Sequence, residues 1–355
     1  MKKHFTTTLI TTLVVLFVSC NKPDDKPESF IYDFSLIVLN EGTWNGNNAS
    51  ITLYDSKTRE VSQDVFFKQN GRNLGDLAND ILIYGGKIYI SVGGSSTLEI
   101  TDLNLKSLSQ ISFDGVAIDA LEPQGLAAYN GNVYIVCFDG KLARLDTLTL
   151  KVNNIIPVGR NPQNIVINNG FAYITNSGGL DFPNYDNTVS VVDLATFTEV
   201  KKIGVGDNPF SIGVDENGDI IVGCRWDYSQ FSLHRIHATT HDVHTFNDVF
   251  VSDFAMRKST IYFYNVAYDP KTWEVLGTEY TAFNTLTGQT RSLINKPSVI
   301  TSPYAINVNH QTESVYISDA IDYKNSGRAF GFDKNGVKLF EFTTGISPKK
   351  IVVLK

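Results

Sequence analysis

The stretch Val191-Val192-Asp193-Leu194-Ala195-Thr196 decides the fold, because its pattern of an apolar strand, a polar turn and a fresh strand occurs seven times. The seven strand ends are Leu53-Tyr54-Asp55, Ile100-Thr101-Asp102, Arg144-Leu145-Asp146, Val191-Val192-Asp193, Arg235-Ile236-His237, Ala282-Phe283-Asn284 and Gly331-Phe332-Asp333. Their last positions follow one another at intervals of 44 to 49 residues. A period in the forties with four short strands is typical of a propeller blade. The sequence therefore predicts an all-β, seven-bladed β-propeller with four antiparallel strands per blade.

The first strand of each blade, strand A, often opens at a proline, whose missing N–H donor costs nothing at a strand start. These prolines are Pro123, Pro162, Pro209, Pro303 and Pro348. Nothing before Leu36 resembles a strand A, whereas the segment 348–355 reads as a strand A with no blade after it. We therefore expect the C-terminal strand to complete the first blade, which closes the ring and leaves no open sheet edge.

The N-terminal residues stand apart from the repeat. Lys2 and Lys3 precede an apolar run at 9–18, which is too short to span a bilayer and fits a secretory signal. Phe17-Val18-Ser19-Cys20 resembles a bacterial lipoprotein processing site, in which Cys20 becomes the lipidated first residue; the alternative is an ordinary signal with an incidental cysteine. We expect a signal peptide at 1–19, a lipid-anchored flexible tether at 20–34 and the propeller at 35–355. Asp24-Asp25 resembles an acidic tag for the outer surface of the outer membrane, so we expect an anchor there, facing the cell exterior.

The charge of the chain argues against nucleic acid as a partner. Without residues 1–19 the chain has 28 Lys and Arg against 37 Asp and Glu, a net charge of −9. A strongly acidic surface repels phosphate backbones and anionic membranes. Cys137 and Cys224 fall in the second strands of blades two apart, too distant for a disulfide, and are expected to be small buried residues.

Long loops predict the functional face. In a blade of this kind the loops between the second and third strands, B and C, share one face of the ring with the links to the next blade. Five of these loops are long, at 40–48, 176–187, 225–230, 267–279 and 319–328. Exposed loop aromatics beside amide and acid side chains suit a large, flat, polar ligand. The candidate ligand-binding residues are Trp44, Asn45, Phe182, Tyr185, Trp226, Tyr228, Tyr268, Trp273 and Tyr323.

Two groups of residues give weaker indications of a metal site or a catalytic site. His234, His237, His241 and His244 straddle one turn of the fifth blade, and a pairing of 231–237 with 241–247 sets His234 against His244. Cross-strand histidine pairs can bind zinc or copper, but exposed outer-strand residues are the commoner case, and we expect no metal here. A propeller hydrolase or lactonase would hold an axial metal, and four residues end their second strands at comparable positions: Glu41, Asn176, Asn265 and Asp319. No phosphate loop or nucleophile elbow is present, so we expect no catalytic residues and favour a binding protein over an enzyme.

A resemblance of several motifs to a known family reduces the number of candidate functions. Tyr173-Ile174-Thr175-Asn176, Asn187-Thr188-Val189-Ser190-Val191-Val192-Asp193 and Val205-Gly206-Asp207-Asn208-Pro209 resemble the YVTN-type propeller repeat. With the lipoprotein start and Leu39-Asn40-Glu41-Gly42-Thr43-Trp44, the chain is similar to the YncE-like surface lipoproteins of gut anaerobes. One branch of that group, the BtuG type, captures cobalamin (vitamin B12) and passes it to an outer-membrane transporter.

The resemblance implies a monomeric propeller with cobalamin as its transported ligand and no resident cofactor. It carries over no site residues. Two other functions stay open at this point. One is a glycan-binding surface module of a nutrient-uptake system, in which exposed tryptophans stack on sugar rings. The other is the metal-dependent hydrolase. Fold alone does not discriminate among the three.

Overall fold

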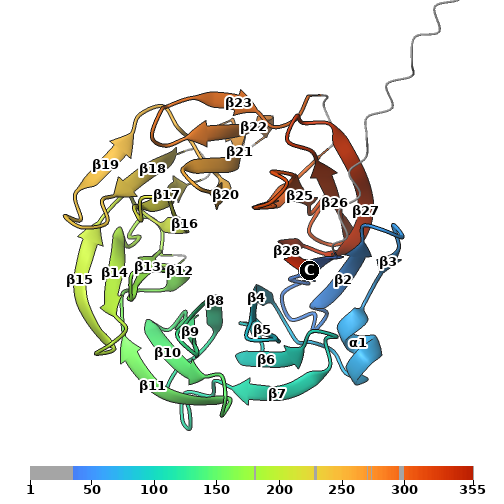
Figure 1. The fold of residues 1–355 in the computed structure, drawn as a ribbon, viewed down its shortest axis with the longest axis vertical. Coiled ribbons are helices and arrows are strands. Elements are labelled where there is room, and N and C mark those ends of the chain that lie inside the picture. The colour runs from blue at the N-terminus through green and yellow to red at the C-terminus, as the bar shows by residue number, and fades with distance from the viewer. Residues whose placement is uncertain are drawn as a thin grey trace, which may run out of the picture. The chain divides into compact units, whose positions relative to one another are not determined.

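The structure is a computed structural model, and its described residues form a ring of blades. It describes residues 35–179, 181–227, 230–269, 271–272, 274–295 and 300–354, with the backbone only at 226, 227 and 230. The strands form seven four-stranded sheets that stand as blades around a central axis (Figure 1). Each sheet runs antiparallel from an innermost strand A to an outermost strand D, which confirms the predicted fold class.

The first four blades, with strands in the order A to D, have these bounds. Blade 1 is β28 (Pro348–Leu354), β1 (Ser35–Asn40), β2 (Ser50–Asp55) and β3 (Val61–Ser62). Blade 2 is β4 (Ala78–Tyr84), β5 (Lys87–Val92), β6 (Thr97–Asp102) and β7 (Ser107–Ser112). Blade 3 is β8 (Pro123–Tyr129), β9 (Asn132–Cys137), β10 (Lys141–Asp146) and β11 (Lys151–Pro157). Blade 4 is β12 (Pro162–Asn168), β13 (Phe171–Asn176), β14 (Thr188–Asp193) and β15 (Thr198–Gly204).

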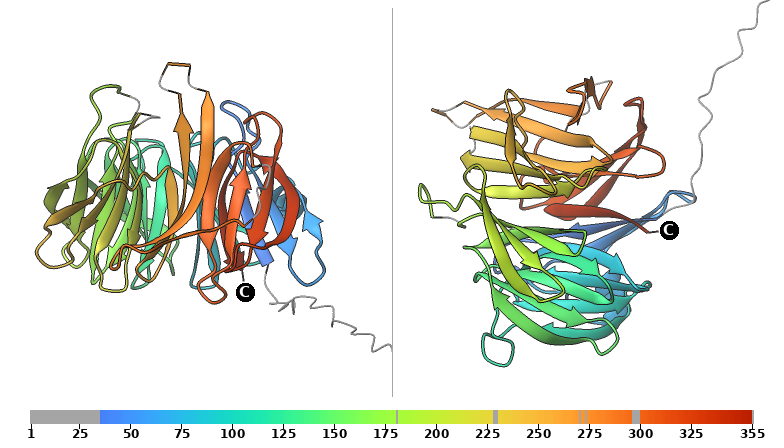
Figure 2. Two further views of the ribbon diagram at one scale, coloured as in Figure 1. Left: turned by 90° about the horizontal axis from the view of Figure 1, so that it is seen from above. Right: turned by 60° about the vertical axis from the view of Figure 1, so that its left-hand side comes forward.

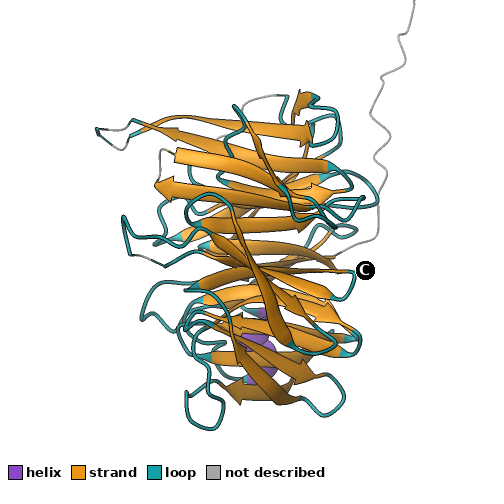
Figure 3. Cartoon of the chain, turned by 90° about the vertical axis from the view of Figure 1, so that its left-hand side faces the viewer, coloured by secondary structure: helices purple, strands orange, loops and turns teal. Residues whose placement is uncertain are grey.

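The last three blades continue the ring in chain order. Blade 5 is β16 (Pro209–Val214), β17 (Ile220–Asp227), β18 (Gln230–Ile236) and β19 (Val243–Phe246). Blade 6 is β20 (Asp253–Arg257), β21 (Thr260–Tyr268), β22 (Val275–Asn284) and β23 (Thr290–Ser292). Blade 7 is β24 (Pro303–Val308), β25 (Val315–Asp319), β26 (Ser326–Phe332) and β27 (Lys338–Ile346). In the side view of Figure 3 these strands run between two faces, and the connecting loops gather at both.

The ring closes through the two ends of the propeller, as predicted. β28 pairs antiparallel with β1, with Val353 opposite Leu36 and Ile351 opposite Val38. Alternate residues of β28 serve two hydrophobic clusters: Ile351 and Val353 pack in the cluster with Leu36 and Val38, whereas Val352 and Leu354 pack against the neighbouring one. The blades pack face to face through such clusters, so second strands such as β5 and β13 are buried on both faces.

The turns between strands C and D are held by the aspartate that ends strand C in most blades. Asp146 Oδ1 accepts the backbone N–H groups of Leu148 and Thr149 at 3.0 and 2.7 Å. These bonds, that of Thr149 first, lower the pKa of Asp146. In blade 5 the Nδ1 atom of His237 takes the same place and accepts the N–H groups of the residues two and three positions on. The repeated aspartates are therefore turn residues.

One helix, which the repeat does not predict, replaces most of strand D in blade 1. α1 (Val65–Asn70) lies on the outside of the ring beside the two-residue strand β3 (Figure 1). It begins after Asp64 and ends before Gly71, both in the left-handed region, and it buries Phe66. A helix of six residues is held by its packing rather than by its own propensity. The described residues contain no helix that is long and apolar enough to cross a membrane.

The expected B–C loops of blades 5 and 6 are largely strands, so their predicted bounds are wrong. β17 continues to Asp227 and β18 begins at Gln230, while β21 continues to Tyr268 and β22 begins at Val275. Their pairing persists beyond the ring, with Val266 opposite Thr278 and Ala267 opposite Gly277. The β21–β22 hairpin therefore rises above the other blades (Figure 2). Cys137 and Cys224 are buried and unpaired, as expected.

Candidate functional site

Six of the seven innermost strands begin with a one-residue irregularity in their pairing. In β4, for example, Ala78 pairs with Val92 and Asp80 pairs with Ser91, so Asn79 has no partner. A bulge of this kind re-aims the side chain of the extra residue. The residues at this position, all half-buried, are Asn79, Gln124, Gln163, Phe210, Tyr304 and Lys349. The sequence thus sends one side chain per bulged blade toward the axis.

The backbone just before these bulges is strained. Leu77, Glu122 and Ser347, each immediately before a strand A, have φ of 51°, 55° and 51°. Asn161 and Asn208 hold the same place in blades 4 and 5 with φ of 44° and 50°. A non-glycine residue in this region costs about 1–3 kcal/mol and persists where the surroundings over-determine it, often at functional sites.

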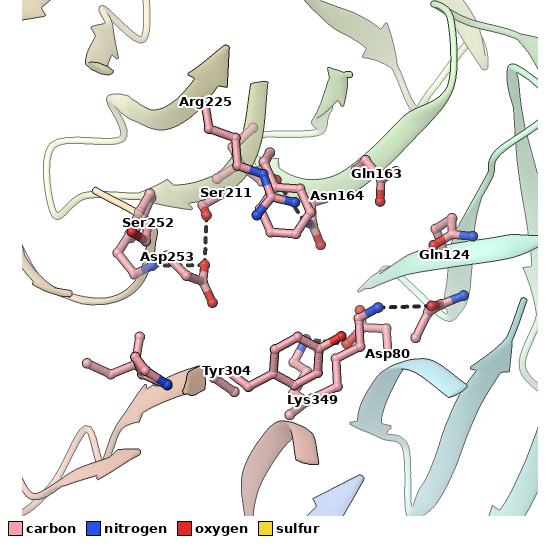
Figure 4. A pocket seen from close by; sticks show the side chains of 18 of the residues that line it. Asp80, Gln124, Gln163, Asn164, Ser211, Arg225, Ser252, Asp253, Tyr304 and Lys349 are labelled. Atoms are coloured by element: carbon pink, nitrogen blue, oxygen red, sulfur yellow. Dashed lines mark hydrogen bonds and ion pairs between the residues drawn. The ribbon is translucent and has the colours of Figure 1, made fainter. Parts of the chain in front are cut away.

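The re-aimed side chains line an axial pocket of about 720 Å³. All six bulge residues line it, and so do parts of the B–C loops, including Gly93, Gly94 and Phe138. The pocket therefore opens at the face that carries the B–C loops. Its lining mixes aromatic rings with amide and hydroxyl groups, as in sites that orient a polar small molecule. Figure 4 shows Arg225, Asp253, Tyr304 and Lys349 extending toward its centre from different blades.

An ionic network joins the first and last strands of the propeller at one wall of the pocket. Lys349 Nζ lies 2.6 Å from Glu41 Oε1 and 3.1 Å from Asn79 Oδ1. The Tyr304 hydroxyl donates to the other oxygen of Glu41, and burial first, then Glu41, raises the pKa of this tyrosine. Lys350 pairs with Asp80. These contacts fix the side chains of blades 7, 1 and 2 relative to one another.

The opposite wall holds a carboxylate and a guanidinium that do not pair with each other. Asp253 Oδ1 accepts the Ser211 hydroxyl at 2.7 Å and the Phe254 N–H at 2.9 Å. Burial raises the pKa of Asp253, and Ser211 and Arg225 oppose the shift. The Arg225 guanidinium lies over the Phe210 ring, 4.1 Å from its centroid. Nearby, burial first and Asp253 second hold the pKa of Tyr264 well above its usual value.

The structure brings three of the nine candidate ligand-binding residues to this pocket. Trp44, Tyr268 and Tyr323 line it. Trp44 and Tyr323 stand at its rim with exposed fractions of 72% and 47%. Tyr323 also packs edge-on against Tyr304, with ring centroids 5.3 Å apart. Tyr268 comes from the end of β21 and not from a loop.

Three other candidates lie on the same face but not in the pocket lining. Phe182 and Tyr185 pack against each other, with centroids 6.0 Å apart, in the loop that Arg160 ties down through Asp181. Asn45 is held by its backbone, whose N–H donates to Asp76 at 3.0 Å. Tyr228, Trp273 and the side chain of Trp226 lie outside the described residues.

Most of the pocket lining comes from strand A, which the loop-based prediction missed. Asn79, Gln124, Gln163, Phe210, Tyr304 and Lys349 were not among the candidates, although a signal for five of them is present in the sequence. Each of those five directly follows a buried proline at a strand A start, which the repeat itself reveals. The residue after such a proline is the one that the bulge turns inward.

The four residues named for an axial metal do not occupy equivalent positions. Asn176 and Asp319 end strands β13 and β25, but Glu41 follows the end of β1 and Asn265 lies inside β21. The Asn176 amide is held by Thr188 and Ser190, both at 2.9 Å, and Asp319 lies 2.7 Å from Arg328. Within the described part of the chain no three His, Cys, Asp or Glu side chains gather closely enough to hold a metal.

The histidine pairing in blade 5 differs by one residue from the prediction. His234 lies opposite Thr245, and His244 lies opposite Arg235, so His234 and His244 point to opposite faces of the sheet. His241 lies 3.4 Å from the ammonium group of Lys201, and burial first, then Lys201, lowers the pKa of its imidazole. The predicted cross-strand pair is therefore wrong.

The comparisons with known proteins support the fold and nothing finer. No family model and no curated protein matches the chain. A quinonprotein alcohol dehydrogenase-like protein from Bacteroides thetaiotaomicron matches with a TM-score of 0.65 and 17% identity, over 91% of this chain and 78% of that one. A functionally unknown protein from Desulfotomaculum acetoxidans has a TM-score of 0.60 and 16% identity over 91% and 99%. Hydrazine synthase from Kuenenia stuttgartiensis has a TM-score of 0.59 and 14% identity over 76% and 92%.

Proposed function

We propose that the protein is a cell-surface lipoprotein that binds a large polar small molecule in its axial pocket, with cobalamin as the first candidate. The observation that supports this most is the pocket itself: about 720 Å³, open at the B–C loop face and lined by amides and aromatic rings. Pockets of 300–1,000 Å³ with a few placed polar groups are typical of small-ligand sites. The resemblance to the YncE-like lipoproteins, one branch of which captures cobalamin, favours this ligand over others.

The chemistry of a corrin suits this lining. A corrin is broad and flat, and carboxamide side chains surround its rim. Trp44 and Tyr323 offer flat faces at the pocket mouth. Gln124 and Gln163 each offer a donor and an acceptor from inner strands. Because these side chains sit on a closed ring, little conformational entropy is lost on binding, and this favours high affinity.

Location and partner follow from the same proposal. Lipidation at Cys20 would anchor the propeller to the outer membrane through the tether at 20–34, with the pocket exposed at the cell exterior. A captured ligand must then be passed on, and an outer-membrane transporter is the proposed recipient. A tightly binding pocket requires that recipient to cover or distort the site before the ligand leaves.

The experiment is a calorimetric titration of the chain from residue 30 onward with cyanocobalamin, together with retention of the red chromophore in gel filtration. One-to-one binding is expected, and Trp44→Ala and Tyr323→Ala should each weaken it by about tenfold or more, because the ligand would bury these exposed rings. Phe182→Ala is the matched control, because Phe182 is an exposed aromatic of the same face that does not line the pocket. The absence of both binding heat and retained colour would exclude cobalamin as the ligand.

The second candidate ligand is a glycan, and the exposed ring of Trp44 at the pocket mouth favours it over the hydrolase. A sugar ring can stack on an indole face while the pocket amides bond its hydroxyl groups. A glycan panel with the same three variants separates the two ligands. Glycan binding that depends on Trp44, without cobalamin binding, would replace the first proposal.

A further inference from the structure

One cation stands without a carboxylate partner among the described residues that line the pocket. Lys349 pairs with Glu41 and Lys350 pairs with Asp80. Arg225, at the end of the regular part of β17, makes a ring contact with Phe210 and has no such ion pair. An arginine left unpaired beside an open cavity keeps its hydrogen-bonding capacity for a ligand.

The position of Arg225 is built by two neighbouring inner strands. The bulge of β16 turns Phe210 toward the axis, and the guanidinium lies 4.1 Å from the centre of that ring. Asn164 of the preceding blade donates from its Nδ2 to the Phe210 carbonyl at 2.8 Å, which fixes the backbone beneath the ring. A guanidinium stacked on a fixed ring keeps its planar fork oriented, so less entropy is lost when it binds.

The acid on the same wall, Asp253, forms no ion pair with this guanidinium among the described residues. Asp253 is near enough for Arg225 to lower its pKa, but its Oδ1 is bonded by Ser211 and by the Phe254 N–H. Gln163 and Asn164, on the blade next to Arg225, line the pocket and add amide groups to the same region (Figure 4). The region therefore offers one guanidinium group with Asp253 on the neighbouring blade on one side and neutral amides on the other.

We propose that Arg225 binds an anionic group of the ligand, a phosphodiester or a carboxylate, which the fork contacts through two parallel N–H···O bonds. Arginine forks match the oxygen spacing of both groups. This proposal rests on the pocket being the ligand site and deepens it by assigning the ligand a negative charge. In cobalamin the group is the phosphodiester that links the corrin to its nucleotide. The carboxamides and the flat ring of cobalamin would contact the other walls of the pocket.

The test is a cycle with two ligands and two proteins. Cyanocobalamin and dicyanocobinamide, which lacks the phosphodiester and the nucleotide, are titrated into the native protein and into Arg225→Gln. Charge-assisted bonds contribute about 1.5–3 kcal/mol, so native protein should bind cyanocobalamin about 10- to 100-fold more tightly than Arg225→Gln does. The variant should bind dicyanocobinamide as the native protein does. An Arg225→Gln variant that weakens both ligands equally, or neither, overturns the proposal.

Two further variants separate charge from geometry and from folding. Arg144→Gln is the matched control, because Arg144 also stacks on a phenylalanine, 4.8 Å from the Phe197 centroid, but does not line the pocket. It should leave both affinities unchanged. Arg225→Lys keeps the charge but loses the fork, and should lie between the native protein and Arg225→Gln.

Measurements without cobalamin test the anion site independently of whether cobalamin is the ligand. The melting temperature of the native protein is measured with dimethyl phosphate, with acetate and with neutral trimethyl phosphate at matched ionic strength. Binding to the folded state alone raises it. A rise with dimethyl phosphate or with acetate, absent in Arg225→Gln, supports the anion site and identifies its preferred anion even if cyanocobalamin does not bind. An equal rise in both proteins, or none in either, contradicts it.

Discussion

Removal of the C-terminal strand should destroy the propeller, because β28 is the strand A of blade 1. Deleting 349–355 takes away Ile351, which is 1% exposed, and three apolar residues that pack against clusters on both sides of the sheet. Burying one such side chain fully contributes about 1.5–3 kcal/mol. One full and three partial burials therefore amount to about 5 kcal/mol, before the unpaired edge of β1 is counted. This is comparable to the whole stability of an ordinary domain, about 5–15 kcal/mol.

The assay is urea unfolding followed by far-ultraviolet circular dichroism, with gel filtration of the same samples. The truncated chain should be largely unfolded or aggregated without denaturant. Ile351→Ala, a milder change, should lower the unfolding free energy by about 2–4 kcal/mol. Leu148→Ala, at a side chain that is 90% exposed, should stay within about 0.5 kcal/mol of the native value. A truncated chain that melts within about 2 °C of the intact one would refute the closure reasoning.

Two other changes test turn residues, and a third tests the histidines of blade 5. Hydrogen bonds from the Asn325 and Lys324 N–H groups lower the pKa of Asp322 from 3.8 to about 2, so its stabilisation is present above pH 3.8 and is lost as the pH falls toward 2. Asp322→Asn should therefore flatten the decline of melting temperature in that window, and an unchanged profile argues otherwise. Arg59 is exposed with φ of 62°, so Arg59→Gly should stabilise the chain by about 0.5–1 kcal/mol while Arg59→Ala should not; equal effects in urea unfolding would contradict this. Zinc at a twofold excess should leave the melting temperature unchanged because His234 and His244 face apart, whereas a rise abolished by His244→Ala would restore the metal site.

The architecture could be predicted from the sequence because the residues that form the turns and the strand starts recur in most blades. Each turn aspartate bonds the backbone two residues on, so its spacing reports the blade period directly. The prolines locate strand A, and β28 (Pro348–Leu354), which no further blade follows, pairs with β1 at the start of the ring. Such features depend on a few neighbouring residues and need no knowledge of the packed structure.

The axial site was harder to predict because it depends on pairing register. Whether Asn79 or Tyr304 faces the axis is decided by a bulge of one residue, and a shift of one residue reverses a side chain. The same sensitivity explains the error at His244, which a single step moves to the other face of blade 5. Of the aromatic residues predicted to bind ligand, Trp44, Tyr268 and Tyr323 line the pocket, whereas Phe182 packs on its own loop.

A crystal structure with cyanocobalamin at saturating concentration would show whether the axial pocket at the B–C loop face is the ligand site. We expect the corrin at the pocket mouth, in contact with Trp44 and Tyr323, with the phosphodiester bound to Arg225. A ligand bound on the Phe182–Tyr185 loop or on the face of the tight turns, with the pocket empty, would contradict this expectation.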